Sequence, residues 1–257
     1  MATLTIAILT LNEAKRISAC VRSAQFADQV LVVDGGSTDG TAELARELGA
    51  EVHVHADWQG FAAQRNRLIG YARGDFVLFL DADEEITPEL REELQAVLAT
   101  GEQATWSIRW TQVAFGKTLH RMRSTVQVQR LFVRSQLLRF EGVVHEQPIL
   151  RTNLPVRVLH HPVLHHSRET IHGSLLKLAQ YAQLGAVKRA QLGKSGGIWR
   201  GLASGLVCFL RLYVLQLGVL CGPQGFLYCL FVSLESFFRY AALRYDPDQL
   251  NVVVKRS

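Results

Sequence analysis

The chain has 257 residues, of which 48% are hydrophobic and 20% are charged, and its formal net charge is +5. This composition excludes a disordered or fibrous chain, and the length suits one large domain or one domain with an appendage. The modest basic excess favours an anionic partner, such as nucleic acid, an acidic membrane surface or a phosphorylated substrate. The four cysteines include no C-x-x-C pair, so a disulfide or zinc framework is not expected.

Strand and helix patterns alternate over the first hundred residues. Short apolar runs predict four strands, at residues 4–11, 29–34, 51–55 and 75–81. Helical spacing and capping residues predict a helix after each strand, at residues 12–24, 41–49, 61–74 and 86–99. In the last helix, Thr87 is the predicted cap and Pro88 takes the first position. Repeated units of this kind imply a mostly parallel sheet with helices on both faces.

The pattern changes after about residue 104. Residues 104–116 and 124–134 alternate apolar and polar side chains, as half-buried antiparallel strands do. A histidine-rich stretch follows at residues 158–167, and a polar, basic helical region runs from about 168 to 200.

The last part, residues 198–245, is strongly apolar. A membrane-crossing helix needs about 20 nearly uninterrupted apolar residues. Arg211 lies in the middle of the first apolar stretch, and the second is too short before Glu235, with CGPQG between them. We therefore expect a helical hairpin that lies in the membrane interface, where the basic segment before it favours an anionic leaflet. A buried or self-associating helix pair is the alternative.

Polar side chains close three of the predicted strands. Ligands of an open parallel sheet bind outside the carboxyl ends of its strands, and these ends lie at one edge. We therefore expect one crevice to be lined by the residues that follow the first, second and fourth strands, namely Thr10, Asn12, Glu13, Asp34, Asp81 and Asp83.

The segment LFLDADEEIT at residues 78–87 places four acidic side chains directly behind a buried strand. Asp81 and Asp83 lie on the same side of an extended segment, and a divalent cation is the simplest way to offset their repulsion. Hard oxygen ligands suit Mg²⁺ or Mn²⁺, which keeps several waters and is completed by substrate phosphates. The alternative is a solvated turn and helix N-terminus, which applies best to Glu84 and Glu85.

The loop DGGSTDGT at residues 34–41 lacks the lysine of a P-loop and the glycine spacing of a dinucleotide-binding fold. Asp34, at the end of its strand, is placed to accept hydrogen bonds from a base or a ribose. A plain glycine turn is the alternative interpretation.

Four motifs together resemble glycosyltransferase family 2, the inverting enzymes with a GT-A fold. They are LTLNE at 9–13, VVDGGSTDGT at 32–41, AAQRNRLIGYARGDFVLFLDADE at 62–84 and VHE at 144–146. With RLF and a later H-x-S, the set is similar to the branch that contains the lipopolysaccharide-core β-1,4-glucosyltransferases. The resemblance covers roughly residues 3–170 and implies a nucleotide-sugar donor, most often UDP-glucose, and a divalent metal.

The resemblance also implies roles for single residues at the donor. Asp34 corresponds to the position that binds the nucleoside. Asn12 and Glu13 correspond to the turn beside the base and ribose, and Arg65 and Asn66 to a helix position that faces the nucleotide.

Further positions concern the diphosphate. Asp81 and Asp83 correspond to the metal–diphosphate motif, and His165 to a histidine that completes the metal or grips the diphosphate. Thr10 is the last residue of the first strand, on the side where the nucleotide-sugar donor is expected to bind. Arg130 is placed to hold a diphosphate or an acceptor phosphate, with a solvated strand arginine as the alternative.

The catalytic base is expected within VHE. The acidic pair that is usual in the wider family is absent, and His145 and Glu146 stand in its place. An inverting transfer needs one general base for the acceptor hydroxyl while the metal stabilises the leaving diphosphate. Glu146 is the only acid between Glu141 and Glu169, so we predict that it is the base. His145 is the rival, since imidazole is also a base near neutral pH.

We therefore predict an α/β chain with a GT-A catalytic domain over residues 1–170, where 1–104 bind the nucleotide sugar and 105–170 the acceptor. Residues 171–257 are predicted to be helical, with interfacial membrane helices at 198–245. The expected reaction transfers a hexose from UDP-glucose to a glycolipid such as the lipopolysaccharide inner core. The expected location is the cytoplasmic face of the inner membrane, as a peripheral or monotopic protein without a nucleic-acid partner.

Three alternatives remain. A polyprenyl-phosphate glycosyltransferase would use the same chemistry, but VHE argues against it. A nucleotidyltransferase would show a glycine-rich phosphate loop with a lysine, which the sequence lacks. A non-catalytic sugar-nucleotide-binding membrane protein would keep Asp34 and the D-x-D motif without needing a base.

Overall fold

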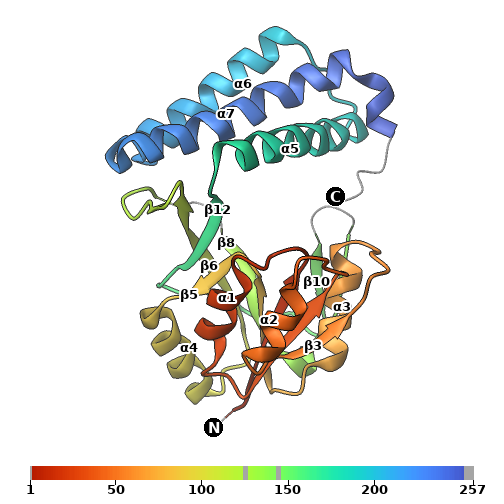
Figure 1. Ribbon diagram of the computed structural model, residues 1–257, viewed down its shortest axis with the longest axis vertical. Helices are drawn as coiled ribbons and strands as arrows, with labels where there is room; N and C mark the ends of the chain where they lie inside the picture. Colours follow the sequence, from red (N-terminus) through yellow and green to blue (C-terminus); the bar gives the residue numbers. More distant parts are fainter. Residues whose placement is uncertain (1, 124–126, 143–145, 252–257) are drawn as a thin grey trace. The chain divides into compact units, whose positions relative to one another are not determined.

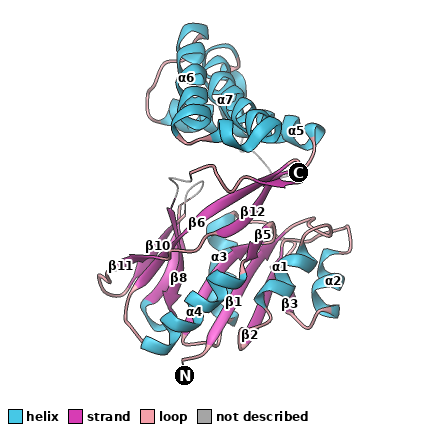
Figure 2. Cartoon of the chain, turned by 90° about the vertical axis from the view of Figure 1, so that its left-hand side faces the viewer, coloured by secondary structure: helices cyan, strands magenta, loops and turns pink. Residues whose placement is uncertain are grey.

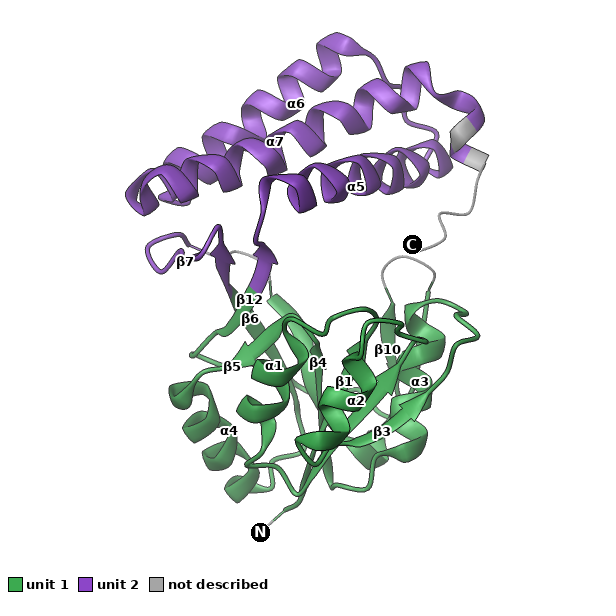
Figure 3. Ribbon diagram, in the orientation of Figure 1, with its two compact units in different colours: residues 1–110, 125–165 green, residues 111–124, 166–257 purple. Residues whose placement is uncertain are grey.

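The computed structural model describes residues 2–123, 127–142 and 146–251. The chain divides into two compact units, coloured separately in Figure 3. Unit 1 comprises residues 1–110 and 125–165, and unit 2 comprises residues 111–124 and 166–257. All predicted site residues that the structure describes belong to unit 1.

A mixed sheet forms the centre of unit 1 (Figure 2). Its parallel part has the order β3–β2–β1–β4, with β1 (Leu4–Thr10), β2 (Gln29–Asp34), β3 (Glu51–Val54) and β4 (Phe76–Asp81). The order continues β8–β6–β12–β5, with β5 (Glu84–Ile86), β6 (Thr105–Ala114), β8 (Gln127–Val133) and β12 (Val163–Arg168). Because β8 is antiparallel to both β4 and β6, the two predicted antiparallel segments are confirmed.

Helices cover both faces of the parallel strands (Figure 1). One core contains side chains of alternate β1 residues with those of α1 (Ile17–Ala24), α2 (Thr41–Glu47) and α4 (Pro88–Thr100). The other core contains the intervening β1 residues, α3 (Phe61–Tyr71) and β9 (Leu137–Glu141). All seven β1 residues are buried, as expected for a central strand covered on both sides. The predicted α/β fold class is therefore confirmed.

The boundaries in this part follow from local chemistry. The Thr87 hydroxyl accepts a hydrogen bond from the Leu90 N–H at 3.2 Å, and Pro88 takes the first position of α4, as predicted. The short strand β5 was not predicted, because the sequence suggested that the acidic segment leads directly into α4. Its pairing with β12 places His165 opposite Glu84.

Smaller elements complete the described chain. β9 pairs with β10 (Gln147–Leu150), and β11 (Val156–Val158) and β7 (Lys117–Thr118) both pair with β6. Single 3₁₀ turns lie at Arg134–Gln136 and Pro247–Asn251.

Unit 2 contains α5 (Ile171–Gln191), α6 (Ile198–Leu210) and α7 (Gly222–Tyr245). A π-helical turn (Arg211–Leu215) extends α6, and a 3₁₀ turn (Gly218–Cys221) leads into α7. Two segments, Ile198–Leu215 and Gly218–Tyr245, are long and apolar enough to cross a membrane by length and composition. Only 17% and 28% of their apolar windows are buried, whereas the core helix of a soluble protein is mostly buried.

Two expectations about these segments are corrected. The second stretch does not end before Glu235, because α7 continues through it and Glu235 forms a buried ion pair with Arg168. The helices separate at Leu217, which has a left-handed φ of 61°. The CGPQG segment begins α7 instead, with its proline in the first turn, where a missing N–H does no harm.

Candidate active site

The strand register brings the predicted residues of three strands to one edge. Thr10 at the end of β1 lies opposite Asp34 of β2, and Leu9 lies opposite Asp81 of β4. The side chains that close these strands therefore share the position where open α/β sheets bind ligands.

Side chains tie the two loops at this edge to each other. The Asn12 N–H donates to the Ser37 hydroxyl at 2.7 Å, and the Thr38 N–H donates to the Asn12 amide oxygen at 2.9 Å. The Glu13 N–H donates to the Thr41 hydroxyl at 2.9 Å. Asn12 has a φ of 53°, a left-handed conformation that asparagine tolerates better than most residues. The turn after β1 is thus held in one geometry by the loop after β2.

Asp34 folds its own loop. One of its carboxylate oxygens accepts hydrogen bonds from the N–H groups of Gly36 and Ser37, at 2.8 and 2.7 Å. The other oxygen accepts from the Ser37 hydroxyl at 2.6 Å. Beside it, the hydroxyl of Thr10 is buried and has no partner among the described residues. Thr10 therefore offers a donor and acceptor at this edge to a ligand.

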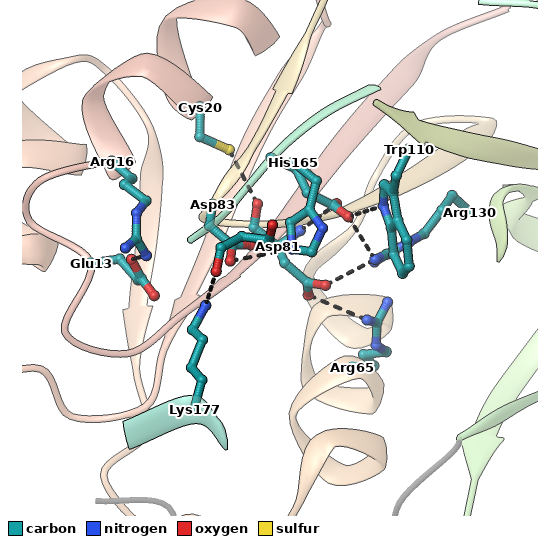
Figure 4. Close-up of polar contacts among 12 residues, drawn as sticks. Glu13, Arg16, Cys20, Arg65, Asp81, Asp83, Trp110, Arg130, His165 and Lys177 are labelled. Atoms are coloured by element: carbon teal, nitrogen blue, oxygen red, sulfur yellow. Dashed lines mark hydrogen bonds and ion pairs between the residues drawn. The ribbon is translucent and has the colours of Figure 1, made fainter. Parts of the chain in front are cut away.

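Two arginines compensate the charge of Asp81 (Figure 4). One carboxylate oxygen lies 3.3 Å from Arg65, and the other lies 2.8 Å from Arg130. Burial alone would raise the pKa of Asp81, but Arg130 and Arg65 outweigh it and hold that pKa well below its usual range. We expected a cation to supply this counter-charge, whereas two side chains far away in sequence supply it.

Glu84 is a buried anchor, with 1% of its surface exposed. One oxygen accepts from the Trp110 indole at 2.6 Å and from Arg130 at 2.9 Å, and the other accepts from the Asp81 N–H at 2.9 Å. Burial raises the pKa of this carboxyl. The expectation that Glu84 belongs to a solvated turn is wrong, because β5 turns Glu84 inward and only Glu85 outward.

Arg130 is not a solvated strand arginine, since 3% of its surface is exposed. Its guanidinium lies over the Trp110 ring, 5.9 Å from the centroid, and one nitrogen serves both Asp81 and Glu84. The Nε and Nη1 groups are buried without a hydrogen-bond partner among the described residues. Unpaired guanidinium N–H groups near the carboxyl ends of the parallel strands suit the oxygens of a phosphate.

Asp83 and His165 are distant in sequence and meet through the pairing of β5 with β12. The His165 Nε2 lies 3.5 Å from an Asp83 carboxylate oxygen, and the ring packs on Trp110 with centroids 5.0 Å apart. Burial alone would lower the pKa of His165, but the contact with Asp83 and the nearby carboxylates outweigh it and raise that pKa. The His165 Nδ1 is buried and has no partner among the described residues. The pair has the geometry of two neighbouring metal ligands.

These residues fit a divalent cation with two protein ligands. Adjacent ligands of an octahedral Mg²⁺ lie about 3 Å apart, close to the separation of Asp83 and His165. Within residues 2–123, 127–142 and 146–251, no group of three or more His, Cys, Asp or Glu side chains is arranged to hold a metal. The remaining ligands would therefore be substrate oxygens and water, as is usual for Mg²⁺.

Arg65 links the acidic segment to the predicted base. Its Nε lies 2.8 Å from a Glu146 carboxylate oxygen, in an ion pair rather than a linear hydrogen bond, while its Nη2 contacts Asp81. The guanidinium is held over the rings of Phe79 and Phe140, 5.8 and 5.6 Å from their centroids. The Glu146 carboxylate is thus in contact with an arginine that packs against two aromatic rings.

Asn66, the other predicted helix residue, holds a strand. Its amide oxygen accepts from the Phe140 N–H at 2.7 Å, and its amide nitrogen donates to the Phe140 carbonyl at 3.1 Å. It therefore fixes β9 against α3. His145, the rival base, lies outside the described residues.

The sequence profile of glycosyl transferase family 2 matches residues 5–153, which include every described site residue except His165. The chain belongs to glycosyl transferase family 2. The family assignment made from its motifs is thereby confirmed.

Two related glycosyltransferases match nearly the whole chain of this family 2 member, and one solved structure matches about two thirds of it. An uncharacterised glycosyltransferase of Rickettsia prowazekii (strain Madrid E) is 26% identical over 249 residues, covering 92% of this chain and 85% of its own. The lipopolysaccharide core biosynthesis glycosyltransferase LpsC of Rhizobium meliloti (strain 1021) is 25% identical over 254 residues and covers 94% of both chains. The crystal structure of S. aureus TarS 1-349 in complex with UDP-GlcNAc has a TM-score of 0.50 and 21% identity, over 67% of this chain and 60% of that chain. This last similarity shows a shared fold.

Two residues of the candidate site were not identified from the sequence. Trp110 lies in an alternating strand pattern in which nothing distinguishes it from a core residue. Glu84 had a signal, because the alternation of Glu84, Glu85 and Ile86 predicts that the first and third side chains point to the same side.

Proposed function

We propose that this family 2 glycosyltransferase transfers a hexose from UDP-glucose to a glycolipid of the lipopolysaccharide inner core, with inversion at the anomeric carbon. The observation that carries the proposal is the cluster in which Arg65 joins Asp81 to Glu146, beside the pair of Asp83 and His165. The similarity to LpsC over nearly the whole chain supports the acceptor class.

The donor would lie at the edge formed by β1, β2 and β4. Thr10 offers its unpaired hydroxyl there, and the loops fixed by Asn12, Glu13 and Asp34 shape the nucleoside site. Arg65 and Asn66 on α3 hold that side of the crevice, through Asp81 and the β9 backbone. The unpaired N–H groups of Arg130 suit the diphosphate.

Asp83 and His165 would hold Mg²⁺ or Mn²⁺, with Asp81 shaping the loop that carries Asp83. When bound, the cation neutralises the charge that develops on the leaving diphosphate. Glu146 accepts the proton of the acceptor hydroxyl as its oxygen attacks the anomeric carbon. The new carbon–oxygen bond forms on the face opposite the breaking bond to the diphosphate, which inverts the configuration.

The proposed catalytic domain covers residues 1–170, with the acceptor on 105–170, and the helical region 171–257 would rest on the cytoplasmic face of the inner membrane. Unit 2 supports this placement because α7 buries polar side chains, Ser233, Glu235 and Ser236, while large apolar side chains of α6 are exposed. That is the reverse of the usual distribution in water.

The direct test is release of UDP from UDP-glucose by the purified protein, with truncated lipopolysaccharide acceptors and with Mg²⁺, Mn²⁺ or EDTA. Acceptor-stimulated, metal-dependent release with a β-linked product is the expected result. Transfer to a polyprenyl phosphate alone would give the site another substrate. Nucleotide binding without turnover on any acceptor would contradict the proposal.

The role of Glu146 is tested by Glu146→Gln, which keeps the side-chain shape but removes the base. We expect normal UDP-glucose binding and a loss of kcat of about 10²-fold or more. His145→Ala should lose less. If both variants fold and the ranking is reversed, the proton acceptor is His145.

A further inference from the structure

An open hollow of about 700 Å³ lies in unit 2, where α5 ends and α6 begins. Its polar lining consists of Lys194, Ser195, Arg200, Ser204 and Tyr240. No Asp or Glu is among the described residues that line it. The hollow, called the basic hollow below, is therefore suited to an anion.

The backbone fixes the turn that carries Lys194. Gly193 ends α5 in a left-handed conformation with a φ of 64°, and the Gly193 and Lys194 N–H groups donate to the carbonyls of Ala190 and Arg189 at 2.9 and 3.0 Å. This double closure is the Schellman arrangement of a helix end. The Gly197 N–H then donates to the Tyr240 carbonyl at 2.8 Å, which ties the loop to α7. The basic hollow is thus built by main-chain contacts.

Positive charge converges on its polar end. Arg200 donates to the Ser195 carbonyl at 3.1 Å and also contacts the Ser195 hydroxyl. The α6 N-terminus starts at Gly197 without a side-chain cap, so its partial positive charge is not offset by a capping side chain. Arg189 does not line the basic hollow itself, and its guanidinium lies against Tyr240, which does, 4.9 Å from the ring centre.

The other end of the basic hollow is apolar. Ala203 and Val207 line it, and the same side of α6 continues with exposed side chains. Trp199 is 82% exposed, Leu206 60% and Val207 66%. Residues at these spacings share one helix face, and an exposed tryptophan at its end is typical of a membrane interface.

We propose that the basic hollow binds the phosphate of an anionic phospholipid. Lys194, Arg200 and Ser195 contact the headgroup phosphate, and the acyl chains lie along the exposed apolar face of α6. The pairing of charge-assisted phosphate contacts with an adjoining apolar face is the chemistry that matches such a lipid. The inference rests on the membrane contact in the proposed function and is independent of the sugar-transfer chemistry.

The test compares two variants that lose the same charge. Lys194→Gln/Arg200→Gln removes two cations that line the basic hollow, whereas Lys188→Gln/Arg244→Gln removes two exposed cations of unit 2 that do not line it. Binding of the full chain to phosphatidylcholine vesicles with and without phosphatidylglycerol is measured by flotation. Because each lost cation would remove a charge-assisted contact with the phosphate, which contributes about 1.5 kcal/mol, the first variant should lose roughly 150-fold in affinity for the anionic vesicles.

The control variant should lose markedly less. Equal losses in the two variants would show diffuse attraction, and no loss in the first would also overturn the proposal. A shift in melting temperature with inorganic phosphate alone, as large as with anionic vesicles, would assign the site to a free anion. UDP-glucose binding should be unchanged in both variants. If the wild type binds vesicles but transfers no sugar, the proposed function fails while this inference stands.

Discussion

At the level of single residues, the charge of the acidic segment is distributed between two kinds of partner. Asp81 and Glu84 are satisfied by arginines, a tryptophan and a backbone N–H, whereas Asp83 faces a histidine whose other nitrogen is unpaired among the described residues. Asp81 and Glu84 therefore hold the segment in place, whereas Asp83 is the carboxylate that would bind the cation in the proposed function.

Asp83→Ala should abolish transfer and metal-dependent nucleotide binding, because the cation loses its only carboxylate ligand in the proposed site. Isothermal titration with UDP, with and without Mn²⁺, measures the effect directly. EDTA should reduce the wild type to the same level. Turnover near that of the wild type in the variant, with EDTA present, would refute the metal role.

Glu84→Gln should destabilise the protein as well as slow it. The carboxylate accepts three hydrogen bonds, and its replacement leaves the buried Arg130 with less counter-charge, a change that costs about 3 kcal/mol in comparable buried pairs. Urea unfolding gives the free energy of unfolding. Glu85→Gln, at the next position with a partly exposed side chain, is the matched control. Equal stability of the two variants would show that Glu84 is no anchor.

At the level of helices and strands, the parallel half of the sheet was predictable and the site within it was only partly so. The strands and helices of residues 4–100 follow from apolar runs, caps and turns that are local in sequence. The contact of Asp81 with Arg130 depends on the pairing of β4 with β8, and that of Asp83 with His165 on the pairing of β5 with β12. The contact of Asp81 with Arg65 depends on how α3 packs on the sheet. Local patterns do not specify these pairings, so the arginine partners of Asp81 could not be foreseen.

The edge strand β3 gives a pH-dependent prediction. Glu51 accepts from Gln29 of β2 at 2.9 Å, and lies 3.0 Å from His53 and 2.7 Å from Arg73. Burial would raise its pKa, but the hydrogen bonds from His53, Arg73 and Gln29 lower it to about 2. Because the folded-state pKa lies below the ordinary value of 4.5, this contribution to stability is complete above that pH and is lost as the pH falls towards 2.

The measurement is the urea midpoint of the wild type and of Glu51→Gln at several pH values. The variant should be less stable at pH values above about 5, and the difference between the two proteins should shrink as the pH falls through the window. A difference that stays constant with pH would show that the Glu51 carboxylate does not titrate with folding.

At the level of the whole chain, unit 1 is a compact unit that carries the proposed active site, whereas unit 2 is helical and has exposed apolar faces. The two units are therefore suited to different environments. We expect the helices of residues 198–245 to dock on the membrane without crossing it. Arg211 lies within the 18-residue first apolar segment, about one turn beyond its centre, and an arginine inside a crossing helix costs up to about 2.5 kcal/mol on insertion scales. In a shallow helix, the same side chain reaches the headgroups.

Docking and crossing differ in where the loop between α6 and α7 ends up. Gln224 lies in the first turn of α7, next to this connection, so a cysteine introduced by Gln224→Cys, in a chain whose four native cysteines are replaced by alanine, reports on the same end of the hairpin. In intact spheroplasts it should stay shielded from a membrane-impermeant thiol reagent, and it should react once the cells are broken open. The same cysteine placed in unit 1 by Arg157→Cys, at an exposed position, controls for access from the cytoplasm. Labelling of the loop cysteine from outside, with the Arg157 control unlabelled, would show a true crossing, because only a hairpin that spans the bilayer carries this loop to the periplasmic side.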